Sequence, residues 1–359
     1  MARKTQKGKA GTKQEAAGGM DDKMQALLYA MQQQNLVYNH DFLYFSNKGV
    51  ESSLVVYHHP DGWVYADDDA SGASSIGYSP NDDSCVIITG KNTTEMTFSQ
   101  ALNEFPRWEK KLAGKTVTAK AYANLGSQSD TDVEISFSLD DGISRKTESI
   151  RSRGDITLEV QLDISTNPKY LKVAVESPTP SATIKISEVC ANVGSVAIES
   201  LSCIVNGIIG ERRQYVATEN PPAEELSLCN GVVGLDSNKT RLDSVLNGRF
   251  GTDEKGVSLL PNMAGYFSRS WDNGAGMDPD ADERTALGGK TNGDHVGTVE
   301  SDAFRTHSHP LNFDQTAIAQ GPSAPGVGLN LSAQSKTGKE GGKETRPVNI
   351  SELYTMKWS

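Results

Sequence analysis

The sequence predicts a mainly β protein, in which a short helix precedes a jelly-roll-type β-sandwich and a glycine-rich region follows it. Between residues 35 and 198, runs of residues alternate apolar and polar with a period of two, as in strands that bury one face. Near the N-terminus the apolar spacing is helical instead. Beyond residue 216 the alternation fades and Gly, Asn, Asp and Ser dominate, while the whole chain holds 34 glycines.

The first residues predict a basic arm followed by an amphipathic helix. Residues 1–20 lack bulky apolar groups apart from their methionines, so they predict a flexible arm, either a plain tail or one that orders on an acidic partner. A helix is expected over residues 21–34, where apolar residues recur at i, i+3, i+4 and i+7: Met24, Leu27, Leu28 and Met31. Since so short a helix is marginal alone in water, its stripe has to dock on this chain's own domain, on symmetry mates or on another protein.

Residues 35–198 predict antiparallel sheets packed face to face. The alternating runs lie at residues 116–123, 132–139 and 156–164, with shorter ones at 85–89, 170–175 and 183–189. Each run presents one apolar and one polar face. Turn residues separate the runs, as in Asp140-Asp141-Gly142. These features predict a β-sandwich of jelly-roll type.

Three phrases in this segment, at residues 35–42, 60–63 and 112–118, give it a family likeness. They resemble the carbohydrate-binding-module-like sandwiches of phage tail proteins. The resemblance implies the fold more strongly than it implies a ligand. Tyr and Trp combine a large apolar face with a polar tip, which suits stacking on sugar rings. The candidate glycan-binding residues are Trp63, Tyr57, Tyr65 and Tyr78, with the alternative that Trp63 belongs to the sandwich core.

The C-terminal third predicts an interior that a single chain cannot complete. Residues 199–215 are expected to be a connector, and residues 275–350 hold few apolar groups with which to build a core. Long structureless stretches inside a compact domain are uncommon. Aromatic anchors nevertheless recur, at Tyr266, Phe267, Trp271, Phe304, Tyr354 and Trp358. We therefore expect a core that is shared between chains rather than a disordered segment.

A long motif occupies residues 260–274, with the pattern Leu-Pro-Asn-x-x-Gly-x-Phe-x-Arg-x-Trp-Asp-x-Gly. Its signature positions are Pro261, Gly265, Phe267, Arg269, Trp271, Asp272 and Gly274. An Asn-Pro-Pro-Ala phrase at 220–223 and a Cys-Asn-Gly turn at 229–231 precede it, and further phrases follow at 293–309 and 341–350. In this order the phrases resemble the tail-collar domain of bacteriophage tail fibres, including short tail fibres.

The resemblance implies an intertwined homotrimer, with a tail-collar domain at residues 216–275 and a receptor-binding tip at 276–359. In related fibres, His-x-His pairs from three chains coordinate a metal on the trimer axis, usually iron and sometimes zinc, and the matching residues are His307 and His309. Side chains two residues apart in an extended strand point the same way, so three such pairs would supply an octahedral shell. The alternative is two exposed loop histidines. A single pair predicts a short, compact tip.

Composition and missing motifs exclude several function classes. The net charge of −11 argues against nucleic-acid binding, and no apolar run is long enough to insert into a membrane. The four cysteines include no Cys-x-x-Cys, which predicts reduced, mostly buried thiols. No apolar stretch resembles a signal peptide, and no Gly-x-Ser-x-Gly elbow is present. A pair of glycosidase carboxylates stays open, because acidic residues are plentiful.

The leading hypothesis is a non-enzymatic homotrimeric tail fibre protein, which is assembled in the host bacterial cytoplasm and carried on the virion tail. Residues 1–34 would attach it to the baseplate or to other tail proteins, and the C-terminal tip would adsorb to a host-surface glycan or protein receptor. Two alternatives are a polysaccharide depolymerase and a purely structural baseplate or short-fibre component. The same fibre could belong to a tailocin or a contractile injection particle.

Overall fold

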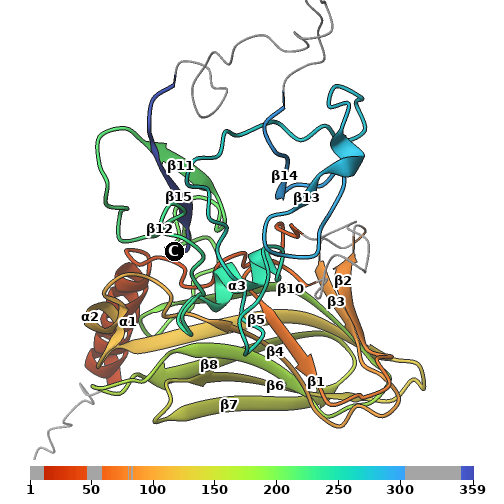
Figure 1. The fold of residues 1–359 in the computed structure, drawn as a ribbon. Coiled ribbons are helices and arrows are strands. Elements are labelled where there is room, and N and C mark those ends of the chain that lie inside the picture. The colour runs from red at the N-terminus through yellow and green to blue at the C-terminus, as the bar shows by residue number, and fades with distance from the viewer. Residues whose placement is uncertain (1–11, 47–58, 80, 82–83, 304–348) are drawn as a thin grey trace, which may run out of the picture. The chain divides into compact units, whose positions relative to one another are not determined.

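The computed structural model describes residues 12–46, 59–79, 81, 84–303 and 349–359, with side chains from residue 20 onwards (Figure 1). The chain divides into two units, Met1–Thr298 with Glu352–Ser359, and Val299–Ser351. The first unit contains nearly all of the described helices and strands. The predicted class is confirmed, because antiparallel strands dominate and a helix stands at the N-terminal end.

Two five-stranded antiparallel sheets form the sandwich (Figure 1). The first sheet has the order β1 (Val64–Asp67), β4 (Met96–Ala101), β9 (Lys172–Ser177), β6 (Val133–Asp140) and β7 (Arg145–Ser152). The second sheet has the order β2 (Ser75–Ser79), β3 (Ser84–Ile88), β10 (Ala182–Val193), β5 (Thr116–Ser127) and β8 (Gly154–Asp163). All six predicted runs coincide with strands of these sheets, so the sandwich prediction is confirmed.

Alternating burial explains why these segments become strands. In β8, Leu158, Val160 and Leu162 are buried, whereas the residues between them are exposed. Their side chains join a single core that receives residues from both sheets. Strand β7 was not predicted, because all but its last residue are exposed and its sequence carries no apolar period. It is an edge strand that pairs with β6.

Helix α1 (Thr12–Ala30) begins earlier and ends earlier than predicted. The expectation of a flexible arm through residue 20 is therefore wrong for residues 12–20, where Ala16 and Ala17 favour helix. A second short helix, α2 (Trp108–Leu112), precedes β5. Among the helices of the described residues, none combines the length and the apolarity that a bilayer crossing requires.

A second, smaller core lies beyond the sandwich. The chain's last strand β15 (Leu353–Lys357) pairs with both β11 (Arg212–Tyr215) and β12 (Glu225–Ser227). Around this sheet, buried apolar residues come from several segments: Val205, Ile209, Leu228, Leu242, Leu260 and Met356. The prediction that residues 199–215 only connect two domains is wrong, because this stretch supplies core residues and a strand.

Helix α3 (Thr240–Leu246) joins the second core to the sandwich. The buried carboxylate of Glu104 accepts the backbone N–H groups of Thr240 at 2.6 Å and Arg241 at 2.9 Å, which caps the first turn of α3. The fully buried guanidinium of Arg241 donates to the carbonyl oxygen of Leu36 at 2.9 Å. Burial lowers the pKa of Arg241, and the nearby Glu104 carboxylate opposes that shift.

Candidate functional site

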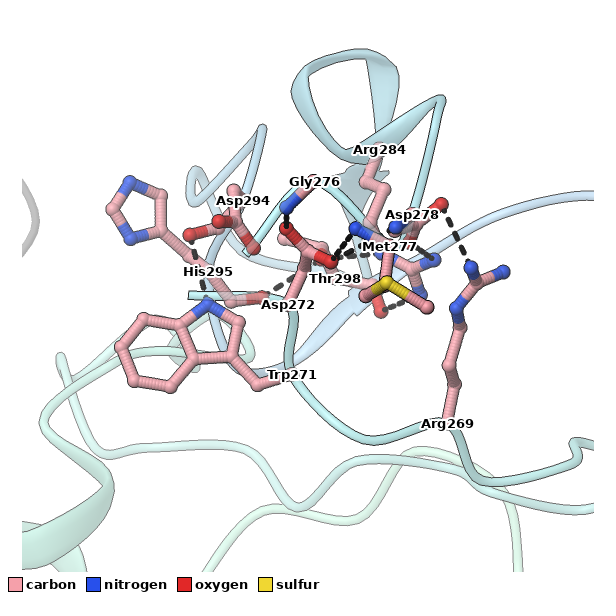
Figure 2. A network of polar contacts seen from close by, with 10 residues as sticks. All are labelled: Arg269, Trp271, Asp272, Gly276, Met277, Asp278, Arg284, Asp294, His295 and Thr298. Atoms are coloured by element: carbon pink, nitrogen blue, oxygen red, sulfur yellow. Dashed lines mark hydrogen bonds and ion pairs between the residues drawn. The ribbon is translucent and has the colours of Figure 1, made fainter. Parts of the chain in front are cut away.

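The signature positions of the motif at residues 260–274 lie in one loop, residues 261–298, which we call the collar loop after the family that the motif resembles. Its regular structure is slight: the 3₁₀ turn η1 (Ala281–Glu283) and the short strands β13 (Thr285–Ala286) and β14 (Thr298–Val299), of which β14 extends one residue past the loop. Figure 2 shows the polar contacts that replace regular structure here. The contacts drawn there include those of the signature residues Arg269, Trp271 and Asp272.

Asp272 holds the first turn of the collar loop. Its Oδ1 accepts the backbone N–H groups of Met277 at 2.7 Å and Asp278 at 2.8 Å, and its Oδ2 accepts that of Gly276 at 2.8 Å (Figure 2). The hydrogen bond from Gly276 is the largest of the causes that lower the pKa of Asp272. The ionised carboxylate therefore fixes residues 272–278 in one conformation.

The buried side chain of Asp278 connects two separate segments of the collar loop. Its buried carboxylate pairs with Arg269 through Oδ1 and with Arg284 through Oδ2, at 3.1 Å each. Arg284 also donates to the hydroxyl and carbonyl oxygens of Thr298, again at 3.1 Å (Figure 2). A buried carboxylate is stable only when charged or hydrogen-bonding partners surround it. The signature position Arg269 thus supplies one of two guanidinium groups that make the burial of Asp278 possible.

Trp271 uses its polar atom inside the loop and leaves its ring outside. Its Nε1 donates to the carbonyl oxygen of Asp294 at 3.0 Å (Figure 2), and the Asp294 carboxylate accepts the N–H of Gly274 at 2.7 Å. The signature glycines Gly265 and Gly274 have φ values of 83° and 73°, a region that disfavours residues with a side chain. Most signature residues are therefore explained as the frame of the loop, and Pro261 is buried at its start.

The same frame carries large apolar side chains that remain in water. The exposed fraction is 62% for Phe267, 51% for Trp271 and 80% for Met277, and Tyr266 and Val296 are exposed as well. We refer to these five residues as the collar apolar residues. Large exposed apolar groups on a soluble chain are typical of interaction surfaces.

Of the candidate glycan-binding aromatics, the structure decides only for Trp63, which takes the alternative role in the sandwich core. Trp63 is completely buried, its ring stacks on Phe98 with centroids 4.5 Å apart, and its Nε1 donates to a backbone carbonyl, so it is a core residue. Tyr65 is half-buried, and burial raises the pKa of its phenol. Tyr78 packs edge-on against Phe45, with centroids 5.3 Å apart. Tyr57 lies outside the described residues.

A groove of about 470 Å³ lies instead on the outer face of the second sheet. We call it the sandwich groove. The polar residues that line it come from β3, β5, β8 and β10: Ser84, Tyr122, Asn124, Asp155, Thr157, Lys185 and Ser187. Strand register aligns Lys185, Asn124 and Asp155 in one row, and the amide of Asn124 donates to the Asp155 carboxylate at 2.7 Å.

Charged groups border the sandwich groove. The hydroxyl of Tyr122 donates to Glu199, and this contact is the main cause that lowers the pKa of Glu199. Lys120 lies 3.4 Å from Glu199 and 3.6 Å from Glu159. Burial raises the pKa of Glu188, which His40 approaches at 3.7 Å. The groove therefore combines hydrogen-bonding side chains with one tyrosine ring, which suits a ligand rich in hydroxyl groups.

Part of the sandwich groove could be predicted from the alternation of residues. The alternating run at 116–123 assigned Lys120 and Tyr122 to the polar face of their strand, which is the face that borders the groove. Alternation cannot show whether that face is hollow, because the curvature of a sheet depends on its neighbours. The groove residues Asn124, Asp155 and Lys185 were therefore not predicted as a site.

The predicted metal ligands His307 and His309 lie outside the described residues. Among the residues that the structure describes, no group of three or more His, Cys, Asp or Glu side chains could hold a metal ion. All four cysteines are free thiols, of which Cys85 and Cys190 are buried. Free thiols agree with the prediction, whereas Cys203 and Cys229 are only half-buried, and burial raises the pKa of Cys190 to about 12.

No family model matches the sequence. The chain is similar to protein RhiB of Rhizobium leguminosarum bv. viciae, with 29% identity over 206 residues that cover 53% of this chain and 93% of that protein. One solved structure with some likeness is TmCBM61 in complex with β-1,4-galactotriose, with a TM-score of 0.32 and 12% identity, over 44% of this chain and 97% of that chain. Another is the CBM22-1 xylan-binding domain of Paenibacillus barcinonensis Xyn10C, with a TM-score of 0.32 and 14% identity, over 46% of this chain and 97% of that chain.

A third is the enzymatically active domain of tailspike protein 4 of bacteriophage CBA120, with a TM-score of 0.30 and 12% identity, over 44% of this chain and 21% of that chain. At these levels of similarity the comparisons assign no function to the chain. The residues of the collar loop and the sandwich groove therefore have to carry the functional argument.

Proposed function

We propose that this chain is the subunit of a homotrimeric fibre protein of the tail-collar type, which attaches a virion tail to a host cell surface. The observation that carries the proposal is the set of collar apolar residues. A rigid loop exposes Phe267, Trp271 and Met277, although the burial of each such side chain would contribute roughly 1.5–3 kcal/mol. These side chains would be buried when three copies come together.

Other copies of the same chain suit this surface better than a transient partner does. Within the collar loop, the carboxylates of Asp272 and Asp278 have their hydrogen-bonding and charged partners in the loop itself. The indole N–H of Trp271 likewise donates to a backbone carbonyl within the loop. What the collar apolar residues offer to a partner is therefore mostly rings and methyl groups, and permanent interfaces between subunits are the more apolar class.

The trimer would also bring together three copies of His307 and His309. Their spacing supports a metal shared on the trimer axis, with iron as the proposed ion and zinc as the alternative. Neutral imidazole nitrogens suit either ion. Because such a site would form only in the assembled state, the metal would stabilise the trimer over separate chains. Residues 1–34 remain the proposed attachment to the baseplate or to other tail proteins.

The sandwich groove is the proposed carbohydrate-binding site of this fibre. The Asn124–Asp155 pair and the hydroxyls of Ser187 and Thr157 would exchange hydrogen bonds with sugar hydroxyls, while Tyr122 lies next to them. A groove with so little aromatic surface predicts weak binding by a single copy. Threefold display would raise the apparent affinity for a surface that carries many copies of the sugar.

Molar mass in solution tests the proposed trimer. The purified chain is expected at three times 38.6 kDa, and a Phe267→Ser/Trp271→Ser variant is expected to dissociate on dilution. Ile143→Ser is the matched control, because Ile143 on the sandwich is 58% exposed and Phe267 is 62% exposed. The control should keep the mass of the parent protein. A monodisperse parent monomer would refute the trimer.

Binding to a glycan array tests the sandwich groove. The parent protein is expected to retain a host-surface glycan that the Asn124→Ala/Asp155→Ala variant releases. Gln161→Ala on β8 is the control, because Gln161 is exposed on the same strand as Asp155 but does not line the groove. Release of reducing ends from the bound glycan would support the depolymerase alternative. A trimer that binds neither glycans nor cells would point to a structural baseplate component.

A further inference from the structure

Helix α1 carries an apolar stripe that its own domain leaves uncovered. The stripe contains Met20, Met24 and Leu27 and continues to Met31 just past the helix end, and all four side chains are exposed. Their spacing is four, three and four residues. Alternating steps of four and three are the a/d pattern of a coiled coil. Leu28, which is also exposed, lies beside Leu27 and widens the stripe.

The C-terminal end of α1 is fixed to the sandwich by contacts that do not involve the apolar stripe. Of residues 20–30, Ala30 alone is buried. It lies against Gly194, where an added Cβ would come within 3.5 Å of the Ala30 side chain. Asn35 then joins the chain to the sandwich, because its backbone N–H donates to Ser202 at 2.9 Å and its side chain accepts the N–H of Ala191 at 3.1 Å.

We propose that residues 20–31 form a parallel three-stranded helical seam with the same residues of two other copies. This inference rests on the proposed homotrimer and names a further surface that assembles it. Met24 and Met31 would occupy a positions, and Met20 and Leu27 would occupy d positions. Leu28, which is exposed, would then stand at an e position, at the flank of the seam.

The sequence around the stripe favours copies of this chain over a membrane. A membrane-surface helix needs basic residues along its polar face, whereas this segment has Asp21 and Asp22 beside the single basic residue Lys23. In the proposed seam, Ala30 falls at a g position, at the flank of the seam. The contact of Ala30 with Gly194 therefore leaves the a and d side chains free to meet those of the other copies.

The seam would depend on the collar for its stability. A helical segment of this length is marginal on its own in water. Once the collar apolar residues hold three chains together, the helices meet at a high effective concentration, and pairing becomes intramolecular. The seam would consequently form after the collar interface and dissociate before it.

Cysteine cross-linking on the full-length protein tests the seam. With Leu27→Cys, mild oxidation is expected to convert about two of every three chains into a covalent dimer, because three thiols meet in one d layer and only two can pair. Asp22→Cys is the control, since Asp22 is exposed at an f position, away from the seam. The unchanged protein gives the background from its own cysteines.

The outcomes separate the seam from the trimer. A trimeric molar mass together with equal cross-linking of Leu27→Cys and Asp22→Cys would overturn the seam and leave the proposed trimer standing. A monomeric mass would overturn both. As a second readout, Leu27→Lys is expected to make the trimer dissociate at a higher protein concentration than the parent protein does. Asp22→Lys should dissociate like the parent protein. An unchanged trimer in Leu27→Lys would also contradict the seam.

Discussion

The sandwich and the collar loop place their apolar side chains in opposite ways. In the sandwich, strand residues such as Val117 and Leu158 alternate with polar ones and meet in one core. In the collar loop, polar contacts around Asp272 and Asp278 determine the conformation, and Phe267 remains in water. A single chain therefore completes the interior of the sandwich, whereas the collar loop takes its conformation from polar contacts and leaves its apolar groups exposed.

This difference has a thermodynamic consequence. The stability of the sandwich should not depend on protein concentration, because its core lies within one chain. The stability of the C-terminal region should rise with concentration, because its exposed side chains gain their burial free energy only on assembly.

Removal of residues 353–359 should unfold the C-terminal region and spare the sandwich. Strand β15 is the middle strand of its sheet, so its loss leaves β11 and β12 without a partner. Its Thr355 also donates to the buried carboxylate of Glu225, at 2.5 Å. Hydrogen exchange should show lost protection at residues 212–227 and unchanged protection in β5 and β8. Unfolding of β5 together with the collar would show that the two regions are one cooperative unit.

A pair of tryptophan substitutions compares the two regions directly. Trp63→Ala should destabilise the sandwich by about 3–5 kcal/mol at every protein concentration, because it removes a buried ring from the core. Trp271→Ala should change the stability of a separate chain far less, since half of its ring is already in water. Its main effect should appear in the assembly of the trimer. Denaturant unfolding at two protein concentrations measures both effects.

The control for this pair is Trp271→Phe. It keeps an apolar ring but removes the hydrogen bond from Nε1 to Asp294, so it separates the frame of the loop from its exposed surface. Trp271→Phe should preserve most of the trimer affinity that is lost in Trp271→Ala. If Trp271→Ala instead shifts unfolding equally at both concentrations, the ring stabilises the single chain and the comparison between the regions fails.

The third prediction asks whether a shared metal also stabilises the C-terminal region. Elemental analysis of the trimer should find one iron, or one zinc, per three chains, and His307→Ala/His309→Ala should lose it. A ligand that binds only the assembled state contributes about 2.7 kcal/mol when its free concentration is a hundred times its Kd. His295→Ala is the control, because His295 belongs to the collar loop but not to the proposed pair. Equal metal content in both variants would refute the site.

The sandwich could be predicted from the sequence because one-sided burial leaves a period of two. Strand β7 shows the limit, since Arg145–Ser152 is almost entirely exposed and leaves no such period. The C-terminal strands were not predicted for another reason. Strand β11 is four residues long and pairs with residues 353–356, so its structure depends on a partner more than a hundred residues away.

The candidate sites could be predicted only in part. The collar motif identified Arg269, Trp271 and Asp272, but not Asp278, the buried carboxylate that both arginines meet. The residue type of Trp63 left a glycan-binding role and a core role open, and the structure places it in the core. Residue type shows that a ring can stack on a sugar, but only tertiary packing decides whether water, a ligand or Phe98 covers the ring.

Two turns, one in the sandwich and one in the collar loop, are each held by a carboxylate, and protonation of that carboxylate should have only a small effect on stability. In the sandwich, burial raises the pKa of Asp141, but N–H groups of Ser144 and Ser165 outweigh this effect and the pKa is lowered. In the collar loop, hydrogen bonds to Asp272, chiefly that of Gly276, lower its pKa as well. A depressed folded-state pKa means that each contact stabilises the fold above the unfolded value of about 3.9.

That stabilisation is lost as the pH falls through each folded-state pKa. Amide chemical shifts followed from neutral to acid pH should therefore show Gly276 and Met277 moving at a lower pH than an ordinary Asp side chain would produce, where Asp272 takes up a proton. In Asp272→Asn these amides should no longer titrate, while Ser144 should titrate unchanged, because its own acceptor Asp141 is intact. If the Gly276 amide titrates identically in Asp272→Asn, another acid controls the turn, and polar contacts of Asp272 do not set the collar loop.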